Sequence, residues 1–285
     1  MNREKVDHYG ATYGKFTENV YARVRREAFG EDIGQTGWLS ADEHEAFLGW
    51  LTLDGSARLL DVACGSGGPT LRAARRTGAR VVGIDLHEDA VRTAARQAEE
   101  AGLADRATFQ RVDASGRLPF ADGEFDALIC VDAVNHLPDR AATFREWARV
   151  LKPRGRLVFT DPIVVTGALT SSEIAIRSSI GFFLFVPPGL DEQLLTESGF
   201  GDVQTEDRTE NMASMARRWW KARAAHADDL RAIEGDESFH GQQRFFDTAA
   251  RLAEERRLSR FAFRARRHGE SSIECGMTPA IQLGL

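Results

Sequence analysis

Cysteine is scarce in this chain of 285 residues, which holds only Cys64, Cys130 and Cys275. Their odd number and wide spacing match neither the paired pattern of a disulfide-rich secreted domain nor the clustered ligands of a zinc site. We therefore expect a reducing, cytoplasmic setting and no bound metal.

A long apolar run is also missing. No hydrophobic stretch of the sequence approaches the roughly 20 residues that a membrane-spanning helix needs. The first residues, Met-Asn-Arg-Glu-Lys-Val-Asp-His, carry too many charges for a signal peptide. We expect no membrane partner.

Basic charge is not in excess either. The chain has 37 Lys and Arg against 43 Asp and Glu, a formal net charge of −6 and a pI of about 5.7. Phosphate backbones attract basic surfaces, so this balance argues against nucleic acid as an obligate partner. With 42% hydrophobic residues the chain can bury a full core, as one large domain or as one domain with a cap.

What the sequence does contain is a strand that breaks into glycines and then starts a helix. Arg58 to Val62 is a short apolar run with one acid, typical of a buried parallel strand. Gly65-Ser66-Gly67-Gly68 follows at once, and Pro69 suits the first position of a helix. Glycines let the backbone approach a ligand, and a helix N-terminus offers free N–H groups and a positive dipole. The pattern indicates an anion- or nucleotide-binding turn, although glycines also join strands and helices without any ligand.

The glycine spacing distinguishes between nucleotides. A dinucleotide fingerprint requires a third glycine for helix packing, and Thr70 occupies that position. Asp61, Gly65 and Gly67 instead form the pattern Asp-x-x-x-Gly-x-Gly. From this turn to about Asp161 the sequence resembles the class I S-adenosylmethionine (SAM) methyltransferases. An NAD-dependent oxidoreductase is the disfavoured alternative.

Acids follow the next two predicted strands as well. Asp85 ends a buried strand and lies 20 residues beyond Gly65, where a carboxylate is expected to accept both hydroxyls of a ribose. Leu86 is expected to lie against the adenine; a helix cap is the alternative role for Asp85. The resemblance implies that Asp113, after the third strand, accepts the adenine amino group and that the N–H of Ala114 binds an adenine ring nitrogen. It also places Asp61, Ala63, Gly65, Gly67 and Val131 in the cofactor site.

The fourth predicted strand is residues 125–131. The loop that follows it is expected to face the methyl group of SAM, because that strand lies beside the first in such sheets. Methyl transfer is an in-line displacement, so the protein mainly aligns the nucleophile, and a base is needed only for a protonated one. His136 is the candidate base, because imidazole titrates near neutral pH. Asn135 is the candidate to orient the acceptor. The alternative is that His136 only holds its own loop or the methionine end of SAM.

Residues 1–50 are expected to form a helical lid. Tyr21 belongs to an aromatic stripe with helical spacing and is a weaker catalytic candidate, with core packing as its alternative role. The glycine-punctuated loop 29–38 resembles the loop that small-molecule methyltransferases place over the methionine end of SAM. Tyr21, Gln35 and Trp38 are the candidates for SAM contacts there.

The expected fold is α/β: a Rossmann-like, seven-stranded, mostly parallel sheet with helices on both faces, an antiparallel last strand and helical lid insertions. Ser40-Ala-Asp-Glu43 is typical of a capping box, and the turn 152–155 resembles the Leu-Lys-Pro-Gly-Gly turn of the family with Arg154 replacing a glycine. The expected divisions are a helical lid (1–50), a SAM-binding core (51–161), a lid insertion (162–190), a core continuation (191–207), a helical cap insertion (208–258), a final core strand (259–268) and a loose tail (269–285).

The resemblance is closest to the small-molecule branch that includes the ubiquinone, tocopherol and sarcosine methyltransferases. It implies SAM as cofactor, S-adenosylhomocysteine (SAH) as product, a C, N or O nucleophile on a small molecule, and a monomer or homodimer. Aromatic residues in both lids favour an aromatic or apolar acceptor, and the abundance of Arg and Ala points to a bacterial secondary pathway. The open alternatives are a polar amine acceptor, a SAM-binding protein without catalysis, and an RNA methyltransferase, the last disfavoured by the acidic pI.

Overall fold

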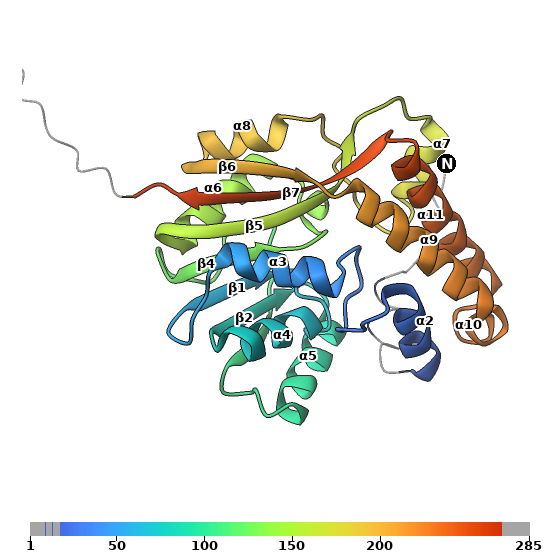
Figure 1. The fold of residues 1–285 in the computed structure, drawn as a ribbon, viewed down its shortest axis with the longest axis horizontal. Coiled ribbons are helices and arrows are strands. Elements are labelled where there is room, and N and C mark those ends of the chain that lie inside the picture. Colours follow the sequence, from blue (N-terminus) through green and yellow to red (C-terminus); the bar gives the residue numbers. More distant parts are fainter. Residues whose placement is uncertain (1–8, 10–12, 14–17, 270–285) are drawn as a thin grey trace, which may run out of the picture.

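The computed structural model describes Tyr9, Tyr13 and residues 18–269, and its seven strands form one sheet (Figure 1). The strands are β1 (Arg58–Val62), β2 (Arg80–Asp85), β3 (Ala107–Arg111), β4 (Phe125–Cys130), β5 (Leu151–Val165), β6 (Phe200–Asp207) and β7 (Leu258–Arg267). Their order is β3-β2-β1-β4-β5-β7-β6. Neighbours from β3 to β5 pair in parallel, while β7 is antiparallel to both β5 and β6. The expected sheet is confirmed.

Helices cover both faces of the sheet because alternate strand residues point to opposite sides. Leu59 packs with α3 (Ala41–Leu51), α4 (Gly68–Thr77) and α5 (Glu88–Glu100), whereas Leu60 packs on the side of α6 (Arg140–Val150) and α8 (Leu190–Glu197). Leu59, Leu60 and Val62 are fully buried, as expected for a central parallel strand. The two apolar cores fix β1, and therefore the turn that follows it.

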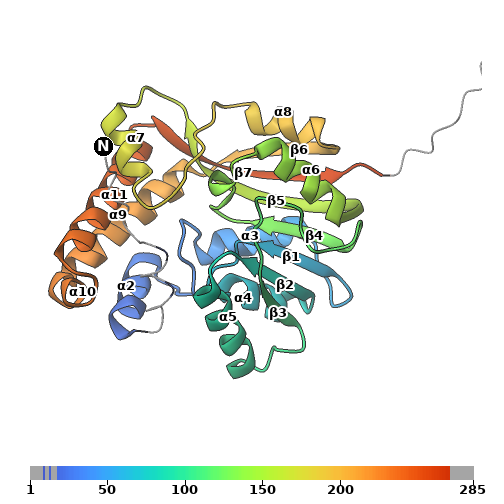
Figure 2. The same ribbon diagram turned by 180° about the vertical axis from the view of Figure 1, so that it is seen from behind.

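A helical cap lies beyond the edge at which the parallel strands end (Figures 1 and 2). It has its own apolar core, in which Trp219, Phe245 and Phe246 are buried. Its helices are α2 (Asn19–Phe29), α9 (Thr209–Ala225), α10 (Ala227–Glu234) and α11 (Asp236–Glu254), with α7 (Ser171–Arg177) packed against α11. The chain thus encloses the C-terminal edge of the sheet.

One local sequence prediction was wrong, and another is confirmed only in part. The predicted turn at 152–155 belongs to β5, and Arg154 takes a φ of 64°, the left-handed conformation that a glycine adopts without strain. The predicted capping box is only half present. Ser40 accepts a hydrogen bond from the Glu43 N–H at 3.2 Å, but the Glu43 carboxylate binds Arg260 instead of returning to the cap.

Within the described residues, no helix is long and apolar enough to cross a bilayer, and no group of His, Cys, Asp and Glu is arranged to hold a metal ion. Cys64 and Cys130 are buried free thiols. Cys275 and nearly all of the predicted tail lie outside the described residues.

Candidate active site

The chain turns sharply where β1 ends. Ala63, Gly65 and Gly67 have φ angles of 59°, 55° and 80°, all in the left-handed region. A Cβ on Gly67 would lie 2.6 Å from the Cβ of Ala94, so a larger residue there would have to displace α5. The turn brings bare main chain to the edge of the sheet and leads directly into the N-terminus of α4.

Asp85 lies at the end of β2, beside this turn. One carboxylate oxygen accepts the N–H of Gly65 at 2.9 Å and the other accepts the N–H of His87 at 2.8 Å. Burial raises the pKa of Asp85 above its ordinary value, and the backbone hydrogen bonds oppose that rise. Each oxygen retains a further lone pair that can accept a hydroxyl of a ligand.

The end of β3 lies next along the same edge, since Asp85 pairs with Arg111 and accepts the N–H of Val112 at its carbonyl. Leu86 is 52% exposed, and it is one of the few large apolar side chains that are exposed in the described part of the chain. Asp113 is exposed, and one of its oxygens accepts from both the N–H and the hydroxyl of Ser115. Ala114 is half-buried against the core. The predicted adenine-binding residues therefore lie at the neighbouring ends of β2 and β3, where Arg111 also donates to the carbonyl of Leu86 at 3.1 Å.

Asp61 lies under the glycine turn, where its carboxylate accepts the hydroxyl of Thr70 at 2.5 Å. Burial raises the pKa of Asp61 to about 7, against the opposing effect of the Thr70 bond. A cavity of about 50 Å³ adjoins it. Its lining includes Gln35, Ala63, Gly65, Pro69 and Val131.

The loop 30–38 covers this cavity. The side chain of Gln35 accepts the N–H of Ile33 and donates to the carbonyl of Glu31, so it stabilises its own loop. Gly68 of α4 lies closely against the backbone of this loop: a Cβ on it would lie 2.0 Å from the Ile33 oxygen and 2.7 Å from the Gly34 Cα. Both obstacles are main chain, so the loop can reach α4 only because residue 68 has no side chain.

We expect Gly68→Ala to lower the free energy of unfolding by about 1–3 kcal/mol, because the added methyl must displace the backbone of the loop. Gly49→Ala, in α3 with no atom within 4 Å of the added Cβ, is the matched control. The control should range from neutral to about 1 kcal/mol more stable. Urea unfolding measures both, and equal effects of the two substitutions would contradict this role of Gly68.

Trp38 lies in the cap rather than over the glycine turn. Its ring stacks on Phe245 at 6.4 Å between centroids with an interplanar angle of 13°. Its backbone N–H donates to Asp132 at 2.7 Å, and Asp132 lies two residues beyond the end of β4. Trp38 therefore joins the loop to the cap through its ring and to the sheet through its backbone.

Asp132 belongs to a buried ionic network that the sequence did not reveal. Arg260 of β7 donates to Asp132 at 2.6 Å and to both oxygens of Glu43 at 2.7 and 2.8 Å. Asn211 of α9 adds hydrogen bonds to Glu43 and to the carbonyl of Trp38. An acid directly after a strand marks Asp132, but Arg260 occurs in an alternating strand where arginine is expected to face solvent.

His136 lies in the 3-10 turn η1 (Val134–His136), between two partners from distant parts of the chain. Its Nδ1 is 2.8 Å from the carbonyl of Phe182, and its Nε2 is 2.8 Å from the hydroxyl of Tyr9. A carbonyl only accepts, so Nδ1 carries the proton and, in the neutral ring, Nε2 accepts from Tyr9. Burial lowers the pKa of His136, which favours this neutral, basic form at pH 7.

Of the other two catalytic candidates, Asn135 lies beside His136 and Tyr21 lies elsewhere. Asn135 is 1% exposed, and neither its Oδ1 nor its Nδ2 has a hydrogen-bond partner among the described residues. The hydroxyl of Tyr21 donates to Glu234 at 2.7 Å inside the cap core. This contact pairs the Tyr21 hydroxyl with Glu234 rather than with His136. Tyr9 provides the hydroxyl at this position, and its membership of the same aromatic stripe was the only signal.

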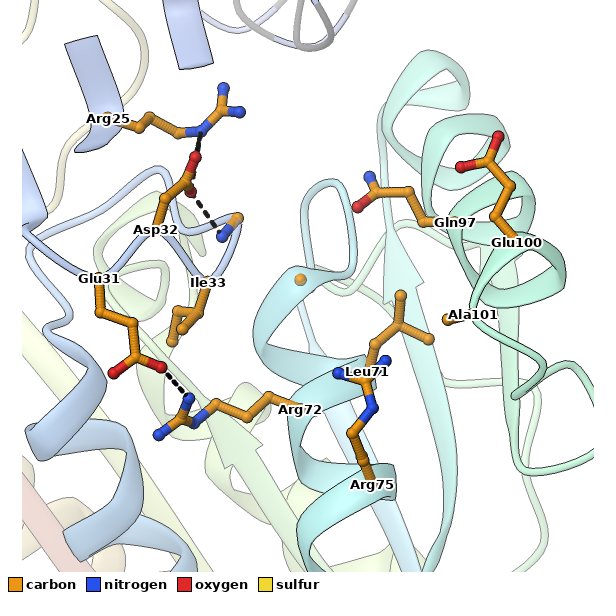
Figure 3. A pocket seen from close by; sticks show the side chains of 12 residues that line it. Arg25, Glu31, Asp32, Ile33, Leu71, Arg72, Arg75, Gln97, Glu100 and Ala101 are labelled. Atoms are coloured by element: carbon orange, nitrogen blue, oxygen red, sulfur yellow. Dashed lines mark hydrogen bonds and ion pairs between the residues drawn. The ribbon is translucent and has the colours of Figure 1, made fainter. Parts of the chain in front are cut away.

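A second, larger cleft of about 550 Å³ lies between the loop 31–34 and helices α4 and α5 (Figure 3). Charged side chains line it: Arg25 pairs with Asp32 on the side of the loop, and Arg72 of α4 pairs with Glu31 across the cleft. None of the predicted cofactor residues contributes to its lining. The glycine turn, Asp85 and Leu86 form a different site.

The sheet has this strand order, a glycine turn after β1, and acids at or just beyond the ends of β1, β2 and β3. Together with the cap, these features define a Rossmann-like nucleoside-binding protein with a helical cap. A family described as "Methyltransferase domain" matches residues 60–159. The chain is 31% identical over 225 residues to the 27-O-demethylrifamycin SV methyltransferase of Amycolatopsis mediterranei (strain S699), covering 75% of this chain and 81% of that protein. The chain belongs to the SAM-dependent methyltransferases, and SAM is its cofactor.

Two further comparisons extend this result. The chain is 27% identical to a phosphoethanolamine N-methyltransferase of Triticum aestivum over 80% of its own length, but spans only 45% of that protein. A Haemonchus contortus phosphoethanolamine N-methyltransferase 2, in complex with phosphomonomethylethanolamine and SAH, superimposes with a TM-score of 0.75 at 20% identity. That superposition covers 92% of this chain and 60% of the other, and it shows a shared fold.

Proposed function

We propose that this methyltransferase acts on a protonated oxygen or nitrogen of a small, aromatic or apolar natural-product-type molecule that binds under the cap. One observation supports this most strongly: the Nε2 of His136 is directed at a hydroxyl, 2.8 Å away, while its Nδ1 is fixed by a carbonyl. A base held in this way serves a nucleophile that must lose a proton. The rifamycin relative, by its printed name an O-methylating enzyme, agrees with such chemistry.

The strand ends supply the proposed cofactor contacts. Asp85 would accept the two ribose hydroxyls with the lone pairs that Gly65 and His87 leave open. Leu86 would lie against the adenine, with Asp113 and the N–H of Ala114 at its edge. Asp61 and the main chain from Ala63 to Gly67 would adjoin the methionine end, together with Gln35 and Val131. SAM supplies a methyl group on a cationic sulfur.

His136 and its neighbours would handle the acceptor. The hydroxyl of Tyr9 marks where a donor hydroxyl lies when it bonds to Nε2. An acceptor hydroxyl in the same position would pass its proton to Nε2, while the Phe182 carbonyl holds the ring in orientation. Burial raises the pKa of Tyr9, so Tyr9 stays protonated and remains a donor rather than a competing base.

We expect His136→Gln to lower kcat by about 10²–10⁴-fold, the usual contribution of a general base. In the unsubstituted enzyme the rate should fall only as the pH drops below the ordinary histidine value of about 6.5, because burial lowers the pKa of His136. The variant should lack this acidic limb. Turnover of methyl-labelled SAM with a panel of phenols, indoles and amines, measured from pH 5 to 9, tests both expectations.

His226→Gln is the control for that substitution, since His226 pairs with Glu27 on the outside of the cap. It should leave both the rate and the pH profile unchanged. Full turnover by His136→Gln across the pH range, with unchanged SAH affinity, would show that His136 only holds its loop.

A polar amine is the second candidate acceptor, favoured by the similarity to the wheat enzyme over most of this chain. The same labelled-SAM panel separates the two candidates when phosphoethanolamine is included. Turnover of phosphoethanolamine above that of every phenol and indole would replace the first candidate by the second.

A further inference from the structure

Arg177, the last residue of α7, differs from every other buried arginine of the described chain. Five arginines are buried there, and four of them have a carboxylate within 3.1 Å. Arg177 is 1% exposed, has no ion pair with any described residue, and its Nε and Nη1 have no hydrogen-bond partner. The paired four are Arg25, Arg140, Arg223 and Arg260.

Aromatic rings surround the guanidinium in place of a counterion. Its Cζ lies 4.3 Å from the ring centroid of Phe245, 5.6 Å from that of Phe183 and 5.8 Å from that of Trp38. Cation–π contacts stabilise the charge, but they leave the N–H donors in the guanidinium plane unsatisfied. Burial lowers the pKa of Arg177 to about 10, which shows that these surroundings disfavour its charge.

This cation adjoins the acceptor side of the proposed active site. The ring of Phe183, which faces Arg177, also packs edge-to-face on His136 with centroids 4.8 Å apart. Burial is the largest influence on both neighbouring groups: it raises the pKa of Tyr9 and lowers that of His136. The positive charge of Arg177 is a further influence, and it lowers both pKa values.

Asn135 supplies a second unsatisfied polar group in the same region. Its side-chain oxygen and nitrogen are both buried without a partner among the described residues. Its carbonyl accepts the N–H of Leu184, which ties η1 to the segment that carries Phe183. A buried cation and a buried amide, neither with a hydrogen-bond acceptor or donor assigned to it among the described residues, therefore lie near the segment around His136. Unsatisfied groups of this kind are costly unless a ligand pairs with them.

We propose that Arg177, assisted by Asn135, binds a carboxylate or phosphate group of the methyl acceptor. This inference rests on the proposed function and narrows its substrate class to molecules with an apolar or aromatic body and one anionic group. The planar guanidinium fork matches either anion with two parallel hydrogen bonds, and the bound anion restores local neutrality. The Phe245, Phe183 and Trp38 rings provide the apolar surface beside the anion.

The alternative is that Arg177 only holds the cap together through its aromatic contacts. A preference for an anion over a neutral ligand distinguishes the two roles of Arg177. Aromatic packing alone gives no preference for an anion over a neutral molecule of the same shape. The test needs no turnover, so its failure is distinct from a failure of the proposed methyl transfer.

The experiment measures thermal unfolding of the SAH-saturated full chain with benzoate, phenyl phosphate or benzamide at equal ionic strength. We expect benzoate, phenyl phosphate or both to bind at least about tenfold more tightly than benzamide, as a charge-assisted hydrogen bond implies. The two anions separate the carboxylate from the phosphate class. Arg177→Met should abolish the preference, Arg177→Lys should keep part of it, and Asn135→Ala should reduce it.

Arg96→Met, an exposed arginine on α5 whose nearest carboxylate is 3.8 Å away, is the matched control and should keep the full preference. If the unsubstituted protein binds benzamide as tightly as both anions, the proposal is wrong. It is equally wrong if Arg177→Met retains the preference. Should Arg177→Met fail to fold, the unsubstituted protein and the Lys and Asn135 variants decide the question.

Discussion

Replacing Arg260 with methionine should lower the free energy of unfolding by about 3–5 kcal/mol, the cost of removing one partner from a buried ionic network. Arg260 is fully buried and binds Glu43 and Asp132, whose side chains are 3% and 4% exposed. Although burial alone would lower its pKa, the two carboxylates raise it above the ordinary arginine value. Without the guanidinium, two negative charges would remain in the interior, and the only other described arginine near them is Arg208, a partly exposed side chain 3.8 Å from Glu43.

The same substitution should also loosen the site, because Asp132 holds the N–H of Trp38 and thereby the loop over the glycine turn. Urea unfolding measures the stability, with Arg231→Met as control. Arg231 makes an ion pair of 2.6 Å with Asp236 on the surface of the cap, and such pairs contribute about 0–1 kcal/mol. If the two variants lose equal stability with equal denaturant slopes, the network is not a main support of the fold.

Replacing Asp85 with alanine should weaken SAH binding by about 100-fold. Two ribose hydroxyls donating to a carboxylate contribute about 1.5 kcal/mol each at the low end of charge-assisted bonds, and each 1.4 kcal/mol is tenfold in affinity. The loss includes the support that the carboxylate gives to the N–H groups of Gly65 and His87. Asp85→Asn, which keeps the volume and one acceptor oxygen, should fall between alanine and the original residue.

Titration calorimetry with SAH measures these affinities. Asp89→Ala is the matched control, because Asp89 lies in the first turn of α5 and its carboxylate pairs with Arg92 on the surface. The control should bind within about twofold of the unsubstituted chain, since surface substitutions away from a site change free energies by at most about 0.5 kcal/mol. A folded Asp85→Ala protein with unchanged SAH affinity would remove Asp85 from the cofactor site.

Much of the fold could be predicted because its signals are local. The strand, glycine turn and helix around Gly65 occupy one short stretch, and the acid at Asp85 follows at a fixed distance along the chain. Strand and helix periodicity then predicted the individual elements, since each period reports which side of an element is buried, and the family resemblance implied how the strands form one sheet. The glycine turn and the acids at this edge of the sheet are therefore visible in the sequence.

The proposed acceptor side was not visible, because its contacts join residues far apart in the chain. His136 meets Tyr9 across 127 positions and Phe182 across 46. Periodicity placed Tyr21 on an apolar face, and a loop resemblance suggested Trp38, but neither signal can tell whether a side chain meets a ligand or the cap core. Arg177 ends a short helix, as arginines commonly do, so its position in the sequence gives no signal. Two features of the structure distinguish it: three aromatic rings pack around it, and no carboxylate pairs with it among its described neighbours.

The central claim, that the nucleoside binds where β1, β2 and β3 end, is tested most directly by a crystal structure of the chain with SAH. The account predicts both ribose hydroxyls within hydrogen-bond distance of Asp85, about 2.5–3.0 Å, and the adenine beside Leu86 and Asp113. Electron density for SAH in the charged cleft between Glu31 and Arg72, with the Asp85 carboxylate making no contact to it, would contradict the account.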